Sequence, residues 1–377
     1  MGRILVFVFT AIFLCLLFTQ PAISAETVKL GLAGPLTGDQ GVFGELLKIG
    51  AVIAMEEWNE KGGVLGKKVE FLWGDDQHDP KQAVSVANKF VNEGVVGVVG
   101  HFNSSCSIPV STIYARFDIP QITPASINSE FTDRGLKNVF RTCGRDDQQA
   151  IVAADFIVNT LKKTKIAVFH DKTTYGQGLA DKVVGELKKL GVEPVFYTGV
   201  VQGDKDYTAV LTAAKQKGPE ILYFGGIHPE AILLARQSRE LGLNAVMFNG
   251  SGTFTQEFID GAGPAADGSY ITFYPDPERI EAAQPFIKKL KEKFPQVREI
   301  SAFTINSYVA ANILLEAIQA TGSTDGKKLS DYIHKTRFNT AAGPIQFDEK
   351  GDLVEAPFVV WQVQNGKFVQ IQEFRKK

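Results

Sequence analysis

The sequence predicts a two-lobed α/β protein in which each lobe is a mostly parallel sheet with helices on both faces. Short apolar runs alternate with amphipathic helical stretches along most of the chain, which is typical of parallel β–α–β units. This alternation restarts near Gln148, after a complete first series. About 350 residues follow an N-terminal leader, and one hydrophobic core rarely serves so many, so we expect two lobes.

The leader, residues 1–25, is typical of a secretory signal peptide. Arg3 supplies a positive charge, residues 4–18 are apolar, and residues 21–25 form a cleavage zone rich in small side chains. The apolar run is too short for a transmembrane helix. We therefore expect export of the chain, with cleavage after Ala25 or, as an alternative, after Ser24.

The charge balance argues against a nucleic-acid or anionic-membrane partner. The chain has 40 Lys and Arg against 42 Asp and Glu, for a formal net charge of −2. Cleavage of the leader removes only one charged residue, Arg3, so the mature chain stays slightly acidic. Proteins that bind these polyanions carry an excess of basic residues.

Residues 26–143 contain the first series of elements. Their apolar runs predict strands over residues 28–33, 69–73, 95–99 and 119–122. A glycine-rich loop, residues 34–44, leads from the first strand into an amphipathic helix that ends near Asn59. Asp79 followed by Pro80 is typical of the N-cap and first position of a second helix.

The stretch over residues 95–127 is the candidate ligand site of this series. An apolar strand leads into small and polar residues at 100–105, and a helix is expected over residues 107–117 with Pro109 in its first turn. Strand ends in open parallel sheets bind ligands, and a helix N-terminus there favours an anion. We hypothesise that the stretch holds the carboxylate, or another polar head, of a small molecule. On this stretch alone, an ordinary β–α–β unit with polar turns is the simpler interpretation.

The second series begins near Gln148 with a helix that we expect to end near Lys162. Strands are predicted over residues 166–169, 195–197, 221–224, 246–248 and 269–274. Further helices are expected over residues 278–294, 301–320 and 325–335. The tail over residues 345–371 alternates like antiparallel strands, which indicates that the chain returns between the lobes.

No motif of an enzyme, metal site or cofactor site is present, so we expect no catalysis, no metal and no cofactor. Residues 75–79 could bind a cation, but a strand-end turn followed by a helix N-cap is the simpler interpretation. Residues 172–178 match a nucleotide-binding loop only weakly. Cys106 and Cys143 could pair in an exported protein, although we expect two separate buried thiols.

Several strand ends instead carry small, hydroxyl or aromatic residues. They lie at residues 38–44, 101–105, 125–128, 172–178, 225–229 and 249–252. If they converge on one cleft, a few polar groups against apolar walls would orient a small ligand. No nucleophile and base accompany them, so the sequence favours a binding protein over an enzyme.

Motifs spread over the mature chain resemble the periplasmic branched-chain amino acid binding proteins, the type I solute-binding components of ABC importers. The matching stretches, in the family's order and spacing, are residues 34–38, 57–63, 75–83, 100–105, 122–125, 170–178, 223–230 and 343–352. The resemblance implies the type I periplasmic binding protein fold, in which two α/β lobes joined by three crossover strands close on a ligand. It places lobe 1 at residues 26–143 plus 275–353, and lobe 2 at residues 144–274 plus 354–377.

The resemblance also implies site residues. Ser104 matches a serine whose hydroxyl and N–H hold the ligand carboxylate, Ala125 a position whose carbonyl accepts from the ligand ammonium, and Tyr175 an aromatic wall from the second lobe. Next to Ser104, the candidate site also includes Phe102, Asn103 and Ser105.

Four site positions depart from the family pattern. Phe43 and Ile227 stand where tyrosines are usual, Ile127 stands for a threonine, and Ser251 stands for the glutamate that pairs with the ammonium. A buried ammonium is costly without a carboxylate partner. We hypothesise a small apolar or aromatic acid without an α-ammonium, or an amide-like solute, while a branched-chain amino acid is the family default. Three acidic residues could replace the glutamate: Asp146, Asp171 and Glu230.

The resemblance implies a monomeric binding protein that delivers one small solute, an amino acid or other small organic acid, to an ABC permease in the inner membrane. The alternative is a sensor or receptor module of the same fold. Such a module would bind an aromatic acid, a 2-oxo acid or an amide and pass its closure to a signalling partner.

Overall fold

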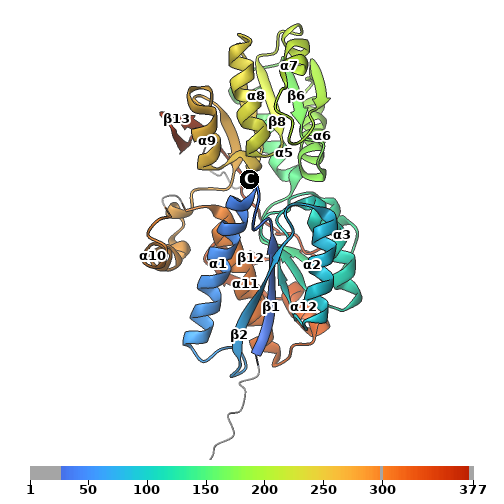
Figure 1. Cartoon of the computed structure of the whole chain (residues 1–377), viewed down its shortest axis with the longest axis vertical. Coiled ribbons are helices and arrows are strands. Elements are labelled where there is room, and N and C mark those ends of the chain that lie inside the picture. Colours follow the sequence, from blue (N-terminus) through green and yellow to red (C-terminus); the bar gives the residue numbers. More distant parts are fainter. Residues whose placement is uncertain (1–26, 298–299, 373–377) are drawn as a thin grey trace, which may run out of the picture.

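The computed structural model describes residues 27–297 and 300–372 and shows two α/β lobes stacked along the long axis of the molecule (Figure 1). One lobe is built on a five-stranded sheet and the other on a seven-stranded sheet. The two-lobed arrangement expected from the sequence is therefore confirmed. The signal peptide expected at residues 1–25 lies outside the described residues.

The five-stranded sheet of lobe 1 is parallel throughout, with the strand order β2-β1-β3-β4-β5. Its strands are β1 (Thr27–Gly34), β2 (Lys68–Asp75), β3 (Val98–Val99), β4 (Gln121–Thr123) and β5 (Val139–Arg141). Carboxyl ends of parallel strands meet at one edge of a sheet, where ligands bind in open α/β folds. The sheet topology therefore brings together the loops after β1, β3 and β4.

Helices cover both faces of this sheet. The helices of lobe 1 are α1 (Gly41–Glu60), α2 (Pro80–Asn92), α3 (Ser104–Arg116), α4 (Glu130–Asp133), α10 (Gln284–Lys293), α11 (Ala302–Thr321) and α12 (Gly326–Lys335). Of these, α10 packs against α1 and lies to the side of the sheet (Figure 1). Helix α11 lies beside α1 although it is distant in sequence, and Trp58 Nε1 donates to Asn312 Oδ1 at 2.9 Å across this contact (Figure 1). Gly50 permits the close approach, because a Cβ there would lie 2.2 Å from the Thr304 carbonyl oxygen.

The seven-stranded sheet of lobe 2 has the order β14-β13-β10-β9-β8-β6-β7. Its strands are β6 (Ile166–His170), β7 (Phe196–Gly199), β8 (Ile221–Gly225), β9 (Val246–Asn249), β10 (Tyr270–Phe273), β13 (Val359–Gln364) and β14 (Lys367–Gln370). Strands β6, β7, β8, β9 and β10 pair in parallel, whereas β13 pairs antiparallel with both β10 and β14. The predicted antiparallel tail is therefore confirmed. A separate hairpin consists of β11 (Arg337–Thr340) and β12 (Gly343–Gln346).

Helices also accompany the sheet of lobe 2. They are α5 (Asp146–Asp155), which continues as a π-helical turn over Phe156–Thr160, α6 (Thr174–Lys189), α7 (Thr208–Lys215), α8 (His228–Glu240) and α9 (Gln256–Ala262). Helices α5 and α6 pack against each other, as do α7 and α8, and α8 and α9. Phe224 and Phe248 are fully buried in the sheet between them. The predicted covering of parallel strands by helices holds in this lobe as well.

Helix α3 begins three residues earlier than the helix expected over residues 107–117. Asn103 is its extended N-cap residue, and Ser104 is its first residue. Pro109 therefore lies in the helix interior and not in the first turn. The expectation rested on the preference of proline for the first turn, but the helix starts where the chain turns out of β3. This difference matters because it makes Ser104 part of the helix N-terminus.

The loop expected over residues 172–178 is helical from Thr174 onward. Thr173 caps α6, because its Oγ1 accepts from the backbone N–H of Gly176 at 2.9 Å. Threonine is a favoured N-cap residue. The glycines of this stretch therefore belong to the first turns of a helix and do not form a nucleotide-binding loop.

The long helix expected over residues 278–294 is α-helical only as α10, from Gln284. Two 3-10 turns, Pro277–Arg279 and Glu281–Ala283, precede it. Pro285 has no backbone N–H and cannot accept the geometry of a continuous helix interior, so it stands in the first turn of α10. The spacing of apolar residues predicted one continuous helix and gave no indication of this break.

An ion pair joins two of the segments that pass between the lobes. Arg141, at the end of β5, is fully buried, and its Nε lies 2.6 Å from Asp352 Oδ1. Arg145 reaches the other oxygen of the same carboxylate at 2.6 Å. The guanidinium of Arg141 also donates to the carbonyl oxygens of Ser126 at 2.7 Å and Asn128 at 3.2 Å. The pair thus holds the loop after β4 against the connecting segments.

We propose that the lobe boundaries follow the sequence expectation: among the described residues, 27–143, 275–297 and 300–353 belong to lobe 1, and 144–274 plus 354–372 belong to lobe 2. Residues 26, 298–299 and 373–377 of the expected lobes lie outside the described residues. Three connecting segments support this division, because they follow β5, β10 and the β11–β12 hairpin and lead from one sheet to the other or to its helices.

Replacing Arg141 by methionine should lower the free energy of unfolding by about 3–5 kcal/mol, because Asp352 would lose one of its two cationic partners and the buried carbonyl oxygens of Ser126 and Asn128 would lose their donor. Urea denaturation followed by circular dichroism measures this loss. Lys350→Met is the matched control, since Lys350 pairs with Asp133 at 2.7 Å on the exposed surface, and such pairs contribute less than about 1 kcal/mol. Equal losses in both variants would contradict a central role for Arg141.

Candidate ligand-binding site

A small cavity lies between the lobes at the carboxyl ends of their strands. Its wall contains seven of the residues predicted from the sequence together with two others. The lining residues are Phe102, Asn103, Ser104, Ala125 and Phe303 on the side of lobe 1, and Tyr175, Ile227, Ser251 and Gly252 on the side of lobe 2. The structure therefore brings segments from six different loops or helix ends to one place.

Three predicted site residues lie outside this wall. Phe43 is fully buried one layer behind, where its ring stacks on Phe102 with a centroid distance of 4.4 Å. Ile127 is buried, and its carbonyl oxygen accepts from the backbone N–H of Asp146 at 2.8 Å. Ser105 is the second residue of α3 and is half-buried. Phe43 therefore supports the cavity wall through Phe102, whereas the hydrogen bond of Ile127 ties the loop after β4 to the start of α5.

The N-terminus of α3 points into the cavity from lobe 1. Ser104 is 1% exposed, and its Oγ lies 3.4 Å from the backbone N–H of Asn128. The first-turn N–H groups of a helix have no partner within the helix, and the helix dipole adds partial positive charge there. Together with the Ser104 hydroxyl, these groups form a site that suits an anion such as a carboxylate.

Buried hydrogen bonds hold the strand end that precedes α3. His101 Nδ1 lies 2.7 Å from Asp76 Oδ2, and both side chains are fully buried. The His101 carbonyl accepts from Thr123 Oγ1 at 2.7 Å and from Ser107 Oγ at 3.0 Å. Gly100 has φ +132°, a conformation that other residues rarely adopt. The chain is thus fixed on both sides of the turn that presents Ser104.

The aspartates of residues 75–79 have structural roles. Asp76 pairs with His101, and Asp79 caps α2 by accepting from the N–H groups of Lys81 and Gln82 at 2.6 and 3.0 Å. Within residues 27–297 and 300–372, no group of three or more His, Cys, Asp or Glu is arranged to hold a metal ion. The strand-end turn with an N-cap is therefore the better interpretation of this stretch.

The wall of lobe 2 is polar but uncharged. The Tyr175 hydroxyl accepts from the Gly252 N–H at 2.8 Å and lies 3.3 Å from Ser251 Oγ. Ser251 Oγ in turn donates to Gln149 Oε1 at 3.3 Å, and Gln149 Nε2 donates to Thr272 Oγ1 at 2.7 Å. Burial raises the pKa of Tyr175 to about 12, so the phenol stays neutral at physiological pH. No group of this network supplies a negative charge.

None of the three acidic residues proposed as substitutes for the family glutamate lines the cavity. Asp171 is 2% exposed, and its Oδ1 accepts from Thr173 N and Oγ1 at 2.9 and 2.6 Å. Glu230 accepts from the Gly203 N–H at 2.9 Å, and Asp146 Oδ1 from the N–H of the next residue. Burial raises the pKa of each carboxyl group, that of Asp171 to about 7. The cavity wall therefore offers no carboxylate to an ammonium group.

Sequence reasoning missed three residues of the site. Phe303 lies on α11 and packs edge-on against Phe102 at 5.1 Å, but its spacing in the sequence marks it only as a core residue. Gln149 supports Ser251 from α5. Gln40 is fully buried, and its Oε1 accepts from Asn103 Nδ2 at 2.8 Å. A glutamine inside a glycine-rich loop gives no signal of burial, so only the structure finds this bond.

The two lobes touch each other around the cavity. Asn128 Nδ2 donates to the Thr174 carbonyl at 2.8 Å, and the rings of Phe43 and His228 meet edge to face at 5.4 Å. Gly178 allows this approach, because a Cβ there would lie 2.4 Å from Asn128 Nδ2. The cavity measures about 20 Å³, which is room for about one water molecule. The lobes are therefore closed, and an organic solute needs them to separate before it can bind.

The hydropathy of the helices and the state of the two cysteines bear on the remaining expectations. Within residues 27–297 and 300–372, no helix has the length and hydropathy needed to cross a bilayer. Cys106 and Cys143 are both buried and free, which confirms the expectation of two separate thiols.

Comparisons with known proteins agree with this architecture. The profile of the periplasmic binding protein family matches residues 27–367. The chain is 41% identical to Leu/Ile/Val-binding protein homolog 2 of Brucella abortus over 369 residues, which cover 98% of this chain and 99% of that protein. It is 43% identical to an amino acid binding protein of Pseudomonas aeruginosa over 349 residues, covering 91% and 92% of the two chains.

A solved structure gives the same result. The leucine binding protein LivK of Thermotoga maritima is 32% identical to this chain and superposes with a TM-score of 0.86, covering 93% of this chain and 98% of that one. The fold class expected from the sequence is therefore confirmed.

Asp171→Asn should change how stability depends on pH. The folded pKa of Asp171, about 7, exceeds the unfolded value of about 3.9, so the folded chain holds an extra proton between about pH 4 and pH 7. The stability that this group contributes is thus present below about pH 4 and is lost as the pH rises through 7. We expect the variant to gain about 2–4 kcal/mol relative to the parent across that window, measured by urea denaturation. Parallel pH profiles would contradict this expectation.

Proposed function

The chain belongs to the periplasmic binding protein family, and from this premise we propose that it is the extracytoplasmic solute-binding protein of an ABC importer. In this role it closes its two lobes on a small, apolar, carboxylate-bearing solute and presents the closed form to a permease. The cleaved leader expected at residues 1–25 supports a location in the periplasm. The absence of a nucleophile and base among the residues that line the described cavity supports binding without catalysis.

One observation carries this proposal. The N-terminus of α3, with Ser104, faces a wall of apolar and neutral residues across the boundary between the lobes. An anion held at Ser104 would be covered by Tyr175 and Ile227 only when the lobes meet. Binding and closure are thereby linked, because the solute contacts both lobes only in the closed form.

The relatives support the class of solute. The proteins of Brucella abortus and Pseudomonas aeruginosa are named for binding leucine, isoleucine and valine, or amino acids in general. Every amino acid carries a carboxylate, and leucine, isoleucine and valine also carry an apolar side chain. In this chain, Ser104 and the N-terminus of α3 are available to bind the carboxylate of such a ligand.

The cavity wall offers no charged partner to the ammonium group of such a ligand. Ser251, Tyr175 and Gln149 form a neutral network where an ammonium would need an anion. Taking an ammonium out of water without a carboxylate partner costs several kcal/mol. We therefore propose that the chain prefers an apolar acid without an α-ammonium to the corresponding amino acid.

Leucine and 4-methyl-2-oxopentanoate differ only at the α-carbon, where one carries an ammonium and the other a carbonyl group. We expect the oxo acid to raise the melting temperature of ligand-free protein more than leucine does, and to bind at least about tenfold more tightly by calorimetry. Tighter binding of leucine would overturn the preference and leave a branched-chain amino acid as the solute. Failure of every small carboxylate to bind would overturn the proposed function itself.

Ser104→Ala should weaken binding of the tighter of these two solutes by roughly tenfold or more, because a hydrogen bond to a charged group contributes about 1.5–3 kcal/mol. Ser105→Ala is the matched control, since Ser105 is the next residue of α3 but lies outside the cavity wall. We expect this control to bind within about twofold of the parent protein by calorimetry. Equal losses in the two variants would show that the assignment of the carboxylate to Ser104 is wrong.

A further inference from the structure

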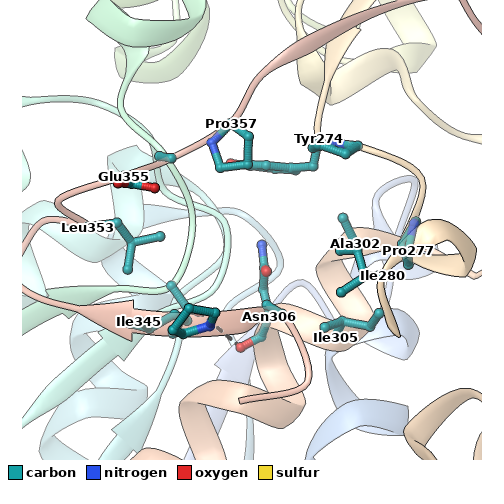
Figure 2. A pocket seen from close by; sticks show the side chains of 15 residues that line it. Tyr274, Pro277, Ile280, Ala302, Ile305, Asn306, Ile345, Leu353, Glu355 and Pro357 are labelled. Atoms are coloured by element: carbon teal, nitrogen blue, oxygen red, sulfur yellow. Dashed lines mark hydrogen bonds between the residues drawn. The ribbon is translucent and has the colours of Figure 1, made fainter. Parts of the chain in front are cut away.

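A second, larger cavity lies where the lobes are joined, outside the cleft between them (Figure 2). Each of the three connecting segments contributes to its wall. The first supplies Thr142, the second Tyr274, Pro275 and Pro277, and the third Leu353, Glu355, Ala356 and Pro357. Helix α11 and the β11–β12 hairpin complete the enclosure. Its volume is about 250 Å³, and an apolar cavity of about 150 Å³ suffices to bind benzene.

Most of this wall is apolar. Figure 2 shows Tyr274 and Pro357 on one side of the space, with Ile305 and Ile345 on the other. Tyr274 is held at both ends, because its hydroxyl accepts from the Gly144 N–H at 3.1 Å and its carbonyl accepts from Trp361 Nε1 at 2.9 Å. A proline has no backbone N–H to satisfy, so the prolines of the wall add little polarity. Such a space suits a flat apolar ring.

The buried polar side chain of Asn306 projects into this space. Asn306 is 6% exposed, and Figure 2 shows its amide in the middle of the cavity. Its Nδ2 donates to the Pro124 carbonyl at 3.3 Å, and because a carbonyl can only accept, this bond fixes the orientation of the amide. Among the described residues, the structure shows no donor to the Oδ1 atom. The described residues of the wall include no Lys, Arg or His side chain to hold an anion.

We propose that this hinge cavity binds a small neutral molecule with a one- or two-ring apolar body and one N–H or O–H donor for Asn306, and that its occupant favours the closed lobes. Any rotation of one lobe against the other moves the connecting segments and therefore changes the wall. A molecule that fits the cavity of the closed form binds that form more tightly and shifts the equilibrium towards it. By linkage, the solute of the cleft must strengthen binding in the hinge cavity by the same factor. This coupling rests on the proposed function.

Indole is a suitable probe, because it is neutral, has two fused rings and carries one N–H donor. We expect full-length mature protein to bind one equivalent of indole, detected by saturation-transfer NMR and titration calorimetry. Indene, which has the same shape without the donor, should bind roughly threefold to tenfold more weakly, because it cannot donate to Asn306. No indole binding, or equal binding of indole and indene, would overturn the assignment.

Two neighbouring alanines give a matched pair of variants. Ala342 lines the cavity, whereas Ala341, equally half-buried in the same hairpin turn, does not. Ala342→Phe should reduce indole affinity by at least about tenfold by filling the space, and Ala341→Phe should leave it within about twofold. Equal losses of indole affinity in the two variants would show that indole binds outside the hinge cavity. Melting temperatures and solute titrations of both variants show that they fold.

The coupling is measured by titrating indole with and without a saturating concentration of the tighter of leucine and 4-methyl-2-oxopentanoate. We expect indole to bind at least about fivefold more tightly in its presence. Unchanged affinity, with solute binding confirmed in the same samples, would overturn the preference for closed lobes. If neither solute binds, the proposed function fails, while the indole, indene and alanine measurements still test the cavity.

Discussion

The buried ion pair between Arg141 and Asp352 fixes two of the segments that connect the lobes at the point where both leave lobe 1. It joins the segment that leaves β5 to the segment that leads back towards β13. The carbonyl oxygens of Ser126 and Asn128 use the other donors of the same guanidinium. Burying two charges is costly unless the geometry and the additional hydrogen bonds are good, and here both Nη atoms of Arg141 donate to backbone carbonyl oxygens. The loop that carries Ala125 is thereby tied to the hinge, so the position of the cleft wall and the path of the connecting segments are set together.

The electrostatics of the cleft are asymmetric. Lobe 1 presents a helix N-terminus, which carries partial positive charge, whereas lobe 2 presents hydroxyl and amide groups that are neutral at physiological pH. The acidic side chains of lobe 2 lie behind the wall, and burial raises the pKa values of Asp171 and Glu230. An anion is therefore attracted to one lobe and enclosed by the other without meeting a charge of its own sign. The same arrangement gives a cation no compensating partner.

A single aromatic layer separates the cleft from the hinge cavity. Phe303 lines the cleft, and its neighbour Ala302 lines the hinge cavity. The ring of Phe273 lies 5.2 Å from both Phe303 and Tyr274, so these side chains form one packed set. Packed aromatic side chains transmit displacement because interiors contain little free space. The structure therefore provides a direct physical connection between the solute site and the hinge.

The sequence by itself determined the alternation of strands and helices, the two-lobed architecture and the positions of Ser104, Tyr175 and Ser251 at strand ends, because periodicity and turn chemistry are local properties. The sequence pattern placed the start of α3 three residues too late and missed the break before α10. In both stretches a proline lies near the helix start, and its position alone does not determine which residue begins the helix. Only the tertiary structure decided that Phe303 faces Phe102, that Gln40 supports Asn103, and that Asp352 neutralises Arg141. These partners are distant in sequence, and their meeting depends on which faces of the sheets and helices pack together. For the same reason the hinge cavity has no counterpart in the sequence, since its wall is assembled from segments that no local pattern connects.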